Sequence, residues 1–242
     1  WTPGVDVAAS MYPGSKTMDK YEQAITADNA PEPDPYGHGS HVAGIAAGRG
    51  AYQSPDTTGI APNANIYDVK VLDGKGFGQV SDVLAGIDWV LYHAKEYNIR
   101  VLNISLAADS SESHLTDPLA RAARAASAAG ITVVAAAGNY GLNANGVQQF
   151  GSVGSPGHEP GVITVGAVNM KGSTKRADDT VTNFSSRGPT RGAYVDPATG
   201  QRVVDNLLKP DLVAPGNAMI SAGSTSTLRD WNLLAKLMPA EE

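Results

Sequence analysis

The sequence predicts an α/β fold of three layers, in which helices cover both faces of a mostly parallel sheet. From residue 66 onwards, short apolar runs alternate with helical patterns, and this alternation favours parallel strands joined by right-handed crossovers. The chain has 242 residues, of which 42% are hydrophobic and 17% are charged. A chain of this length and composition can bury the core of one such domain. We therefore interpret residues 1–242 as a single domain.

The first half of the chain contains two predicted helices and one predicted strand. Residues 41–48 (HVAGIAAG) predict a short buried helix, which its last glycine ends. The apolar run 66–73 (IYDVKVLD) predicts a strand. A longer helix follows, which begins at Ser81 or Asp82 and is capped at Asn98. Its apolar face comprises Val83, Leu84, Ile87, Val90, Leu91 and Ala94.

Three further apolar runs predict strands of the same sheet. Residues 99–107 (IRVLNISLA) are almost continuously apolar, which is typical of a strand covered on both faces. Residues 131–137 and 161–168 predict the other two strands. Ligands of such sheets bind at the carboxyl ends of the strands. The residues at the ends of the first two runs are therefore candidates for a site.

The helix between these strands carries the only basic cluster of the chain. Thr116 or Asp117 begins it, Pro118 takes its first position, and a glycine ends it. Arg121 and Arg124 lie on this otherwise alanine-rich helix, and we interpret them as a solvated face. The formal net charge is −6, whereas nucleic-acid partners need clustered Lys and Arg. We expect no nucleic-acid partner.

Composition excludes several other kinds of site. The chain has no cysteine, so it has no disulfide framework, no thiol nucleophile and no thiolate metal site. Its longest apolar runs are far shorter than a membrane span, and we expect no membrane partner.

A histidine flanked by glycines is the feature that most favours chemistry. The stretch 34–44 reads DPYGHGSHVAG. Gly37 and Gly39 remove side chains from either side of His38, so its imidazole can approach a substrate and a nucleophile. A lone histidine in such a turn is more often structural, and the interpretation of His38 therefore depends on the rest of the sequence.

Five further stretches follow this one in a fixed order. They are VLNISLA (101–107), VVAAAGN (133–139), GSPGHEPGVITVGAV (154–168), NFSSRGPT (183–190) and KPDLVAPG (209–216). With them, roughly residues 34–227 resemble the catalytic domain of the subtilisin-like serine proteases, or subtilases. Agreement of several ordered motifs is far more specific than any one of them.

The resemblance implies a serine endopeptidase that acts through a Ser/His/Asp triad. His38 would be the general base, and Asn139 would donate to the oxyanion. From the residues alone, a turn residue is the preferred interpretation of Asn139, and the resemblance is what favours the oxyanion donor. The family commonly has Gly after the Leu of its substrate-binding strand, where this chain has Ala107. The substrate-binding residues that the resemblance implies are Ser105, Leu106, Ala107 and Gly138.

Two motifs of the family do not occur in this chain. We interpret Asp6 as a loop carboxylate, because no Thr-Gly or Ser-Gly follows it. Ser221, Ser224 and Ser226 lie outside any Gly-Thr-Ser-x-Ala sequence. The resemblance is therefore to an incomplete domain, which carries the His and the Asn but lacks the catalytic Ser and Asp. Alone, we expect it to be inactive and to leave strand edges unpaired beside an open apolar groove.

Other residues of the motifs have plainer interpretations. Asp34 precedes His38 and would order the loop, and His41 would be a packed structural histidine. Residues 74–78 (GKGFG) match a phosphate-binding loop only weakly and predict a turn. We expect no cofactor and assign no metal site. Calcium, which many subtilases bind, cannot be assigned to particular residues.

The resemblance implies a peptide or protein substrate, an extracellular location and a monomeric full-length protein. Two alternatives stay open. The domain could bind peptides without cutting them, or it could be a nucleotide-binding α/β domain, in which His38 and Asn139 would have no role.

Overall fold

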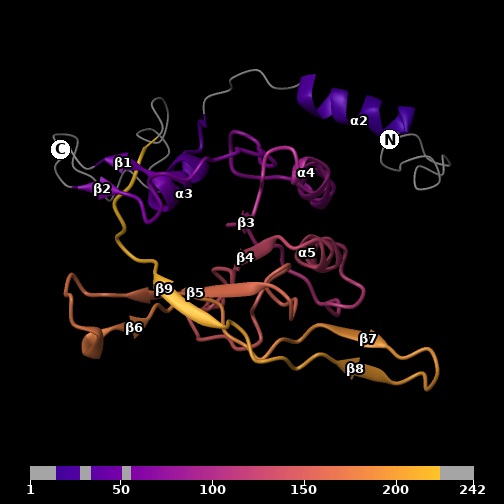
Figure 1. The fold of residues 1–242 in the computed structure, drawn as a ribbon. Coiled ribbons are helices and arrows are strands. Elements are labelled where there is room, and N and C mark those ends of the chain that lie inside the picture. Colours follow the sequence, from indigo (N-terminus) through magenta and orange to yellow (C-terminus); the bar gives the residue numbers. More distant parts are fainter. Residues whose placement is uncertain (1–14, 28–33, 51–55, 224–242) are drawn as a thin grey trace.

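The fold is organised around a five-stranded sheet (Figure 1). The structure is a computed structural model and describes residues 15–27, 34–50 and 56–223. The pairs β3–β4, β4–β5 and β5–β9 are parallel, whereas β6 pairs antiparallel with β5. The prediction of a mostly parallel sheet is confirmed. The strands are β3 (Val101–Ile104), β4 (Thr132–Ala136), β5 (Ile163–Asn169), β6 (Thr180–Val181) and β9 (Leu212–Pro215).

Helices lie on both sides of this sheet, as the three-layer prediction requires. α4 (Val80–His93) and α5 (Pro118–Ala128) pack against each other. Figure 1 shows α3 (His38–Ala47) on the other side of β3. Within the described residues, no helix is long and apolar enough to cross a membrane. The smaller elements are α2 (Lys16–Ala27), β1 (Arg49–Gly50), β2 (Thr57–Thr58), the 3₁₀ helix η1 (Arg176–Asp178), β7 (Ala193–Val195) and β8 (Arg202–Val204).

The hydrophobic core joins α4 and α5 to β3 and β4. Burying one large apolar side chain of this kind contributes about 1.5–3 kcal/mol to stability. The core therefore fixes where the carboxyl ends of β3 and β4 lie, and with them the segments at 105–107 and 138–140. Its buried members are Val83, Ile87, Ile104, Leu119, Ala123, Ala126, Val133, Ala135 and Val162.

Helix α5 begins as its sequence predicts. Asp117 is the N-cap, with its Oδ1 accepting a hydrogen bond of 2.9 Å from the backbone N–H of Ala120, and Pro118 is the first helical residue. The same carboxylate also accepts hydrogen bonds of 2.7 Å from the hydroxyls of Ser110 and Ser155. Burial acts to raise the pKa of Asp117, but the hydrogen bonds from Ser155, Ala120 and Ser110 outweigh it and hold this pKa below its usual value.

Replacing Asp117 by alanine should lower the free energy of unfolding at pH 7 by about 1–3 kcal/mol, because a cap is lost and the buried Ser155 hydroxyl loses its acceptor. The charged carboxylate adds to the free energy of unfolding above the unfolded-state pKa of about 3.9. This contribution disappears as the pH falls through the lower pKa of the folded state. Urea unfolding at several pH values measures both effects. Asp68→Ala, at an exposed aspartate, serves as the control. If Asp117→Ala lowers the free energy of unfolding by the same amount at pH 7 and below pH 3, the charge of the cap does not contribute.

Helix α4 differs from its prediction by a few residues. It begins at Val80, one residue before the predicted start at Ser81 or Asp82, and the carboxylate of Asp82 accepts a hydrogen bond of 3.1 Å from the N–H of Gln79. It ends at His93, so the predicted cap at Asn98 is wrong. Asn98, with φ of 52°, instead ends the turns that follow the helix.

Two strand predictions need correction. The segment 66–73 is not a strand in the structure, because it has no ladder of backbone hydrogen bonds to a neighbour. The run 99–107 forms a strand only at 101–104, and it is not covered on both faces, since Val101 and Asn103 are exposed. Apolar composition alone could not show that the structure leaves a groove beside this strand.

The interpretation of Arg124 as part of a solvated face is only partly right, because its side chain is 39% exposed but its guanidinium pairs with a buried carboxylate. Its Nε donates to Oε1 of Glu159 at 3.1 Å, and its Nη2 reaches Nδ1 of His114 at 2.9 Å. The side chain of Glu159 is only 4% exposed, and a buried carboxylate of this kind needs a charged partner. Arg121 is exposed, as predicted.

Candidate active site

The loop before α3 presents His38 at the first position of that helix. Gly37 has φ of 78°, a conformation that favours glycine. The carboxylate of Asp34 accepts hydrogen bonds from the backbone N–H groups of Gly37 at 2.7 Å and Ser40 at 2.8 Å. Burial acts to raise the pKa of Asp34, but these hydrogen bonds and the nearby His38 hold it below its usual value. Asp34 thus orders the loop, as predicted.

The ring of His38 reaches the segment that follows β3. Its Nε2 lies 2.9 Å from the carbonyl oxygen of Ser105. A carbonyl only accepts, so Nε2 carries the proton in this contact. A histidine that acts as a base through Nε2 needs its proton on Nδ1, held there by an acceptor. Among the described carboxylates, none lies within ion-pair distance of His38.

The segment after β3 is held on one edge by the chain near Ser155. Ala108 and Ser155 exchange two backbone hydrogen bonds of 2.9 Å. On the other edge, the carbonyl of Ser105 meets His38, and the carbonyl of Ala107 accepts a hydrogen bond of 3.1 Å from the Tyr140 hydroxyl. Side chains from two other segments, His38 and Tyr140, therefore reach the carbonyl oxygens of Ser105 and Ala107.

Asn139 lies in a turn that Ser186 holds from both sides. The N–H of Ser186 donates to the carbonyl of Gly138 at 3.0 Å, and its hydroxyl accepts from the N–H of Tyr140 at 3.0 Å. Gly138 has φ of 105°, which only glycine adopts readily. Asn139 is exposed, and no hydrogen bond of its side chain is found within the described part of the chain. Its amide is free to donate to a ligand.

Sequence reasoning missed two residues of this region, Ser186 and Tyr140. Ser186 lies inside the recognised stretch NFSSRGPT, so its position could have drawn attention, but its partner Tyr140 is 46 residues away. Tyr140 directly follows Asn139, and nothing local indicates that its hydroxyl reaches Ala107.

The structure places two of the predicted site residues, Ser105 and Asn139, after the ends of two neighbouring strands. β3 and β4 are adjacent and parallel, and Ser105 and Asn139 follow their carboxyl ends. His38 contacts Ser105, and the neighbour of Asn139 contacts Ala107. Within the described residues, no hydrogen bond joins His38 to Asn139, and the roles assigned to them stay predictions.

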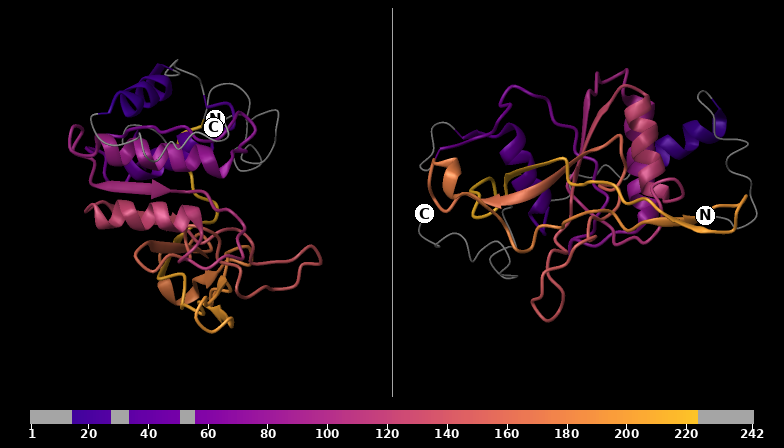
Figure 2. Two further views of the ribbon diagram at one scale, coloured as in Figure 1. Left: turned by 90° about the vertical axis from the view of Figure 1, so that its right-hand side faces the viewer. Right: turned by 90° about the horizontal axis from the view of Figure 1, so that it is seen from below.

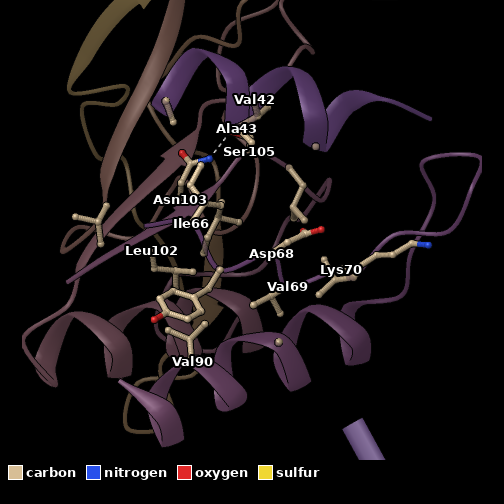
Figure 3. Close-up of a pocket in the computed structure, with 18 of the residues that line it drawn as sticks. Val42, Ala43, Ile66, Asp68, Val69, Lys70, Val90, Leu102, Asn103 and Ser105 are labelled. Carbon is tan, nitrogen blue, oxygen red and sulfur yellow. Dashed lines mark hydrogen bonds between the residues drawn. The ribbon is translucent and has the colours of Figure 1, made fainter. Parts of the chain in front are cut away.

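A groove of about 920 Å³ opens beside β3, between α3, α4 and the extended segment 66–72 (Figure 3). His38, Ser105 and Leu106 are among the residues that line it, whereas Ala107, Gly138 and Asn139 are not. Its other lining residues are mostly apolar, including Val42, Ile66, Val69, Val90 and Leu102. The expected apolar groove is therefore present, beside an edge of β3 that no described strand pairs with.

The residues interpreted as structural have structural contacts. Nε2 of His41 lies 3.1 Å from the carbonyl oxygen of Met219, and the hydroxyl of Ser221 donates to the carbonyl of His41 at 2.8 Å. The side chain of Ser221 thus connects its segment to α3. Asp6, Ser224 and Ser226 lie outside the described residues.

The stretch 74–78 forms a turn, as predicted. The carboxylate of Asp73 accepts hydrogen bonds of 2.9 Å from the N–H groups of Lys75 and Phe77. These amides are not free to bind phosphate, which disfavours the nucleotide-binding alternative. In the described ranges, no group of three His, Asp or Glu side chains could hold a metal ion.

Comparisons with known proteins show which family the sequence resembles. The sequence profile of the subtilase family matches residues 6–235. The chain is 37% identical to the serine protease AprX of Bacillus subtilis (strain 168) over 202 residues, 81% of this chain and 41% of that protein. It is also 37% identical to subtilisin E of the same strain, over 68% of this chain and 38% of that protein.

Solved structures give the same result. A psychrophilic protease, S41, superposes with a TM-score of 0.59 at 31% identity, over 77% of this chain and 54% of that one. Sphericase also superposes with a TM-score of 0.59, at 28% identity, over 77% of this chain and 55% of that one. The chain thus spans about half or less of the length of these proteins.

Proposed function

This chain belongs to the subtilase family, and from that premise we propose that it carries the general base and the oxyanion donor of a serine endopeptidase, His38 and Asn139. The observation that supports this most directly is the contact of His38 with Ser105. This contact brings the imidazole to the carboxyl end of β3, and Asn139 follows the carboxyl end of the neighbouring strand β4.

In the proposed reaction, His38 accepts the proton of a serine hydroxyl at Nε2 while that oxygen attacks the peptide carbonyl. His38 then gives the proton to the leaving amine. For this role, the Nε2 proton now shared with Ser105 has to leave, and the imidazole has to hold its proton on Nδ1. We propose that the nucleophile and the carboxylate that orients Nδ1 lie outside the described residues.

Asn139 donates its amide N–H to the oxygen that becomes negative as the tetrahedral intermediate forms. The substrate pairs as an extended strand with Ser105, Leu106 and Ala107, which offer the carbonyls of Ser105 and Ala107 as acceptors. Gly138 is a further substrate-binding residue in this proposal, and it has no space for a side chain, because a Cβ there would lie 2.9 Å from the Ser186 hydroxyl oxygen. The substrates proposed are peptides or proteins, without a cofactor, and the proposed location is extracellular.

Hydrolysis of fluorescein-labelled casein by the complete product of the reading frame that encodes this chain tests the proposal. We expect hydrolysis that phenylmethylsulfonyl fluoride, a serine-modifying reagent, abolishes. We expect the 242-residue chain alone to show none. Binding of casein-derived peptides without hydrolysis by the complete product would reject the enzyme and favour the peptide-binding module.

A further inference from the structure

The turn at 73–77 lies against the loop that leads into α3. A Cβ placed on Gly74 would lie 2.9 Å from Cγ of Pro35, and one placed on Gly76 would lie 2.7 Å from Cε1 of the Tyr36 ring. Gly76 also has φ of 80°, a conformation that favours glycine. The turn therefore lacks side chains at the two positions where Pro35 and Tyr36 pack against it.

Hydrogen bonds within the turn fix its shape. The backbone N–H of Asp73 donates to the carbonyl of Phe77 at 2.7 Å, and that of Gly76 donates to the carbonyl of Asp73 at 3.0 Å. The Asp73 carboxylate accepts further hydrogen bonds of 2.9 Å from the N–H groups of Lys75 and Phe77. These hydrogen bonds are made inside the turn, so it offers the Tyr36 ring a fixed surface.

The segment that leads into the turn is anchored to the hydrophobic core. Val71 packs against the core that joins α4 and α5 to β3, and these three elements lie one above another in the left view of Figure 2. A Cβ placed on Gly86 of α4 would lie 2.7 Å from Cγ1 of Val71, so the valine lies close to the helix backbone. The packed core thereby fixes the position of the turn relative to β3.

The ring of Tyr36 reaches from the turn to the imidazole of His38. The two ring centroids lie 6.5 Å apart, with their planes inclined at 54°, within the range over which aromatic rings contact. Both residues are half-buried, and both line the groove beside β3, as does Gly76. The hydrogen bonds of Asp34 hold the backbone of this loop, whereas Tyr36 contacts the His38 ring itself.

We propose that the turn at 73–77 positions the imidazole of His38 through Tyr36, so that Tyr36 and Gly76 are positioning residues for the general base. This rests on the proposed function, in which His38 is that base. A methyl group at Gly76 would displace the Tyr36 ring, and the ring would no longer limit the orientation of the imidazole. A misplacement of about 1 Å lowers the rate of catalysis by as much as about 10²-fold. This role accounts for two of the glycines in the stretch 74–78.

Casein hydrolysis by the complete reading-frame product gives the first test. Gly76→Ala should lower kcat by about 10- to 100-fold and leave KM unchanged, because the base is misplaced while the substrate still binds. Gly172→Ala is the matched control. Gly172 has φ of 68°, and a Cβ there meets nothing within 4 Å, so this variant introduces similar backbone strain without displacing a ring. It should leave kcat unchanged.

Substitutions of Tyr36 separate the ring contact from general damage to the turn. Tyr36→Ala should lower kcat as Gly76→Ala does. In the Tyr36→Ala background, Gly76→Ala should lower kcat no further, because the ring that the methyl group displaces is absent. Tyr36→Phe keeps the ring and should retain kcat. Additive losses in the double variant, or a loss in Tyr36→Phe equal to that in Tyr36→Ala, would contradict the proposal.

Nuclear magnetic resonance of the complete product, labelled with ¹⁵N-histidine, tests the proposal independently of catalysis. The ring signals of His38 are those that disappear in His38→Ala. Gly76→Ala and Tyr36→Ala should shift these signals, and Gly172→Ala should not. Unshifted signals overturn the proposal, as does an equal loss of kcat in Gly76→Ala and Gly172→Ala.

Two further outcomes keep the proposal and the proposed function apart. If Gly76→Ala does not fold, kcat and the His38 signals of Tyr36→Ala and Tyr36→Phe decide. If the unmodified product hydrolyses no casein, the proposed function fails, and the His38 signals alone decide whether the turn positions the imidazole.

Discussion

Replacing His38 by alanine should lower kcat of the complete reading-frame product by about 10⁴- to 10⁶-fold, the upper figure being that known for subtilisin. The structure gives the reason, because His38 is the side chain of α3 that reaches the carboxyl end of β3. Without it, no described group near Ser105 can accept the proton of a nucleophile. Initial rates of casein hydrolysis under saturating substrate measure the effect.

His41→Ala is the matched control, since His41 lies one turn further along the same helix. Its ring contacts the backbone of Met219, and its loss should affect stability more than kcat. Thermal unfolding of both variants separates damage to α3 from loss of the base. Equal kcat values for His38→Ala and His41→Ala would rule out His38 as the base.

Replacing Asn139 by alanine should lower kcat by about 10²- to 10³-fold with little change in KM, a range that subtilisin itself set for loss of one oxyanion donor. The charge on the oxygen develops only in the transition state, so the amide contributes little to substrate binding. The turn should survive the substitution, because Ser186 holds the backbone of Gly138 and Tyr140 without using the Asn139 side chain.

Asn145→Ala, in the exposed part of the loop that follows, is the control for Asn139. It should leave kcat and KM unchanged. A residue that only shapes the turn would behave differently from an oxyanion donor, since Asn139→Ala would then lower the melting temperature and leave kcat nearly unchanged. Such a result, or a rise in KM alone, would contradict the oxyanion role.

Local signals predicted the helix termini well where the capping residue and the helix are neighbours. Asp117 and Pro118 begin α5, and Gly130, with φ of 88°, follows its end. Asp34 orders the loop before His38 through backbone groups three and six residues away. Hydrogen bonds between residues so close in the sequence depend on only a few backbone dihedral angles. The residues of these segments favour the values that the hydrogen bonds require.

Partners far apart in the sequence could not be predicted in this way. Arg124 finds Glu159 at a separation of 35 residues, and only the packing of α5 against the chain before β5 brings them together. The segment 66–73 has the composition of a strand, but a strand also needs a neighbour with free backbone groups. The sequence of the segment carries no information on that neighbour.

The sequence by itself determined the family, the α/β class and the candidate site residues, because ordered motifs and hydrophobic periodicity can be read along the chain. Only the tertiary structure shows that the ring of His38 contacts the carbonyl of Ser105 and that the Tyr140 hydroxyl donates to the carbonyl of Ala107. These partners are 67 and 33 residues apart in the sequence. Both contacts depend on the register of β3 with β4 and on the placement of α3 against the sheet. Packing of the whole core sets these quantities, and a single segment does not encode them.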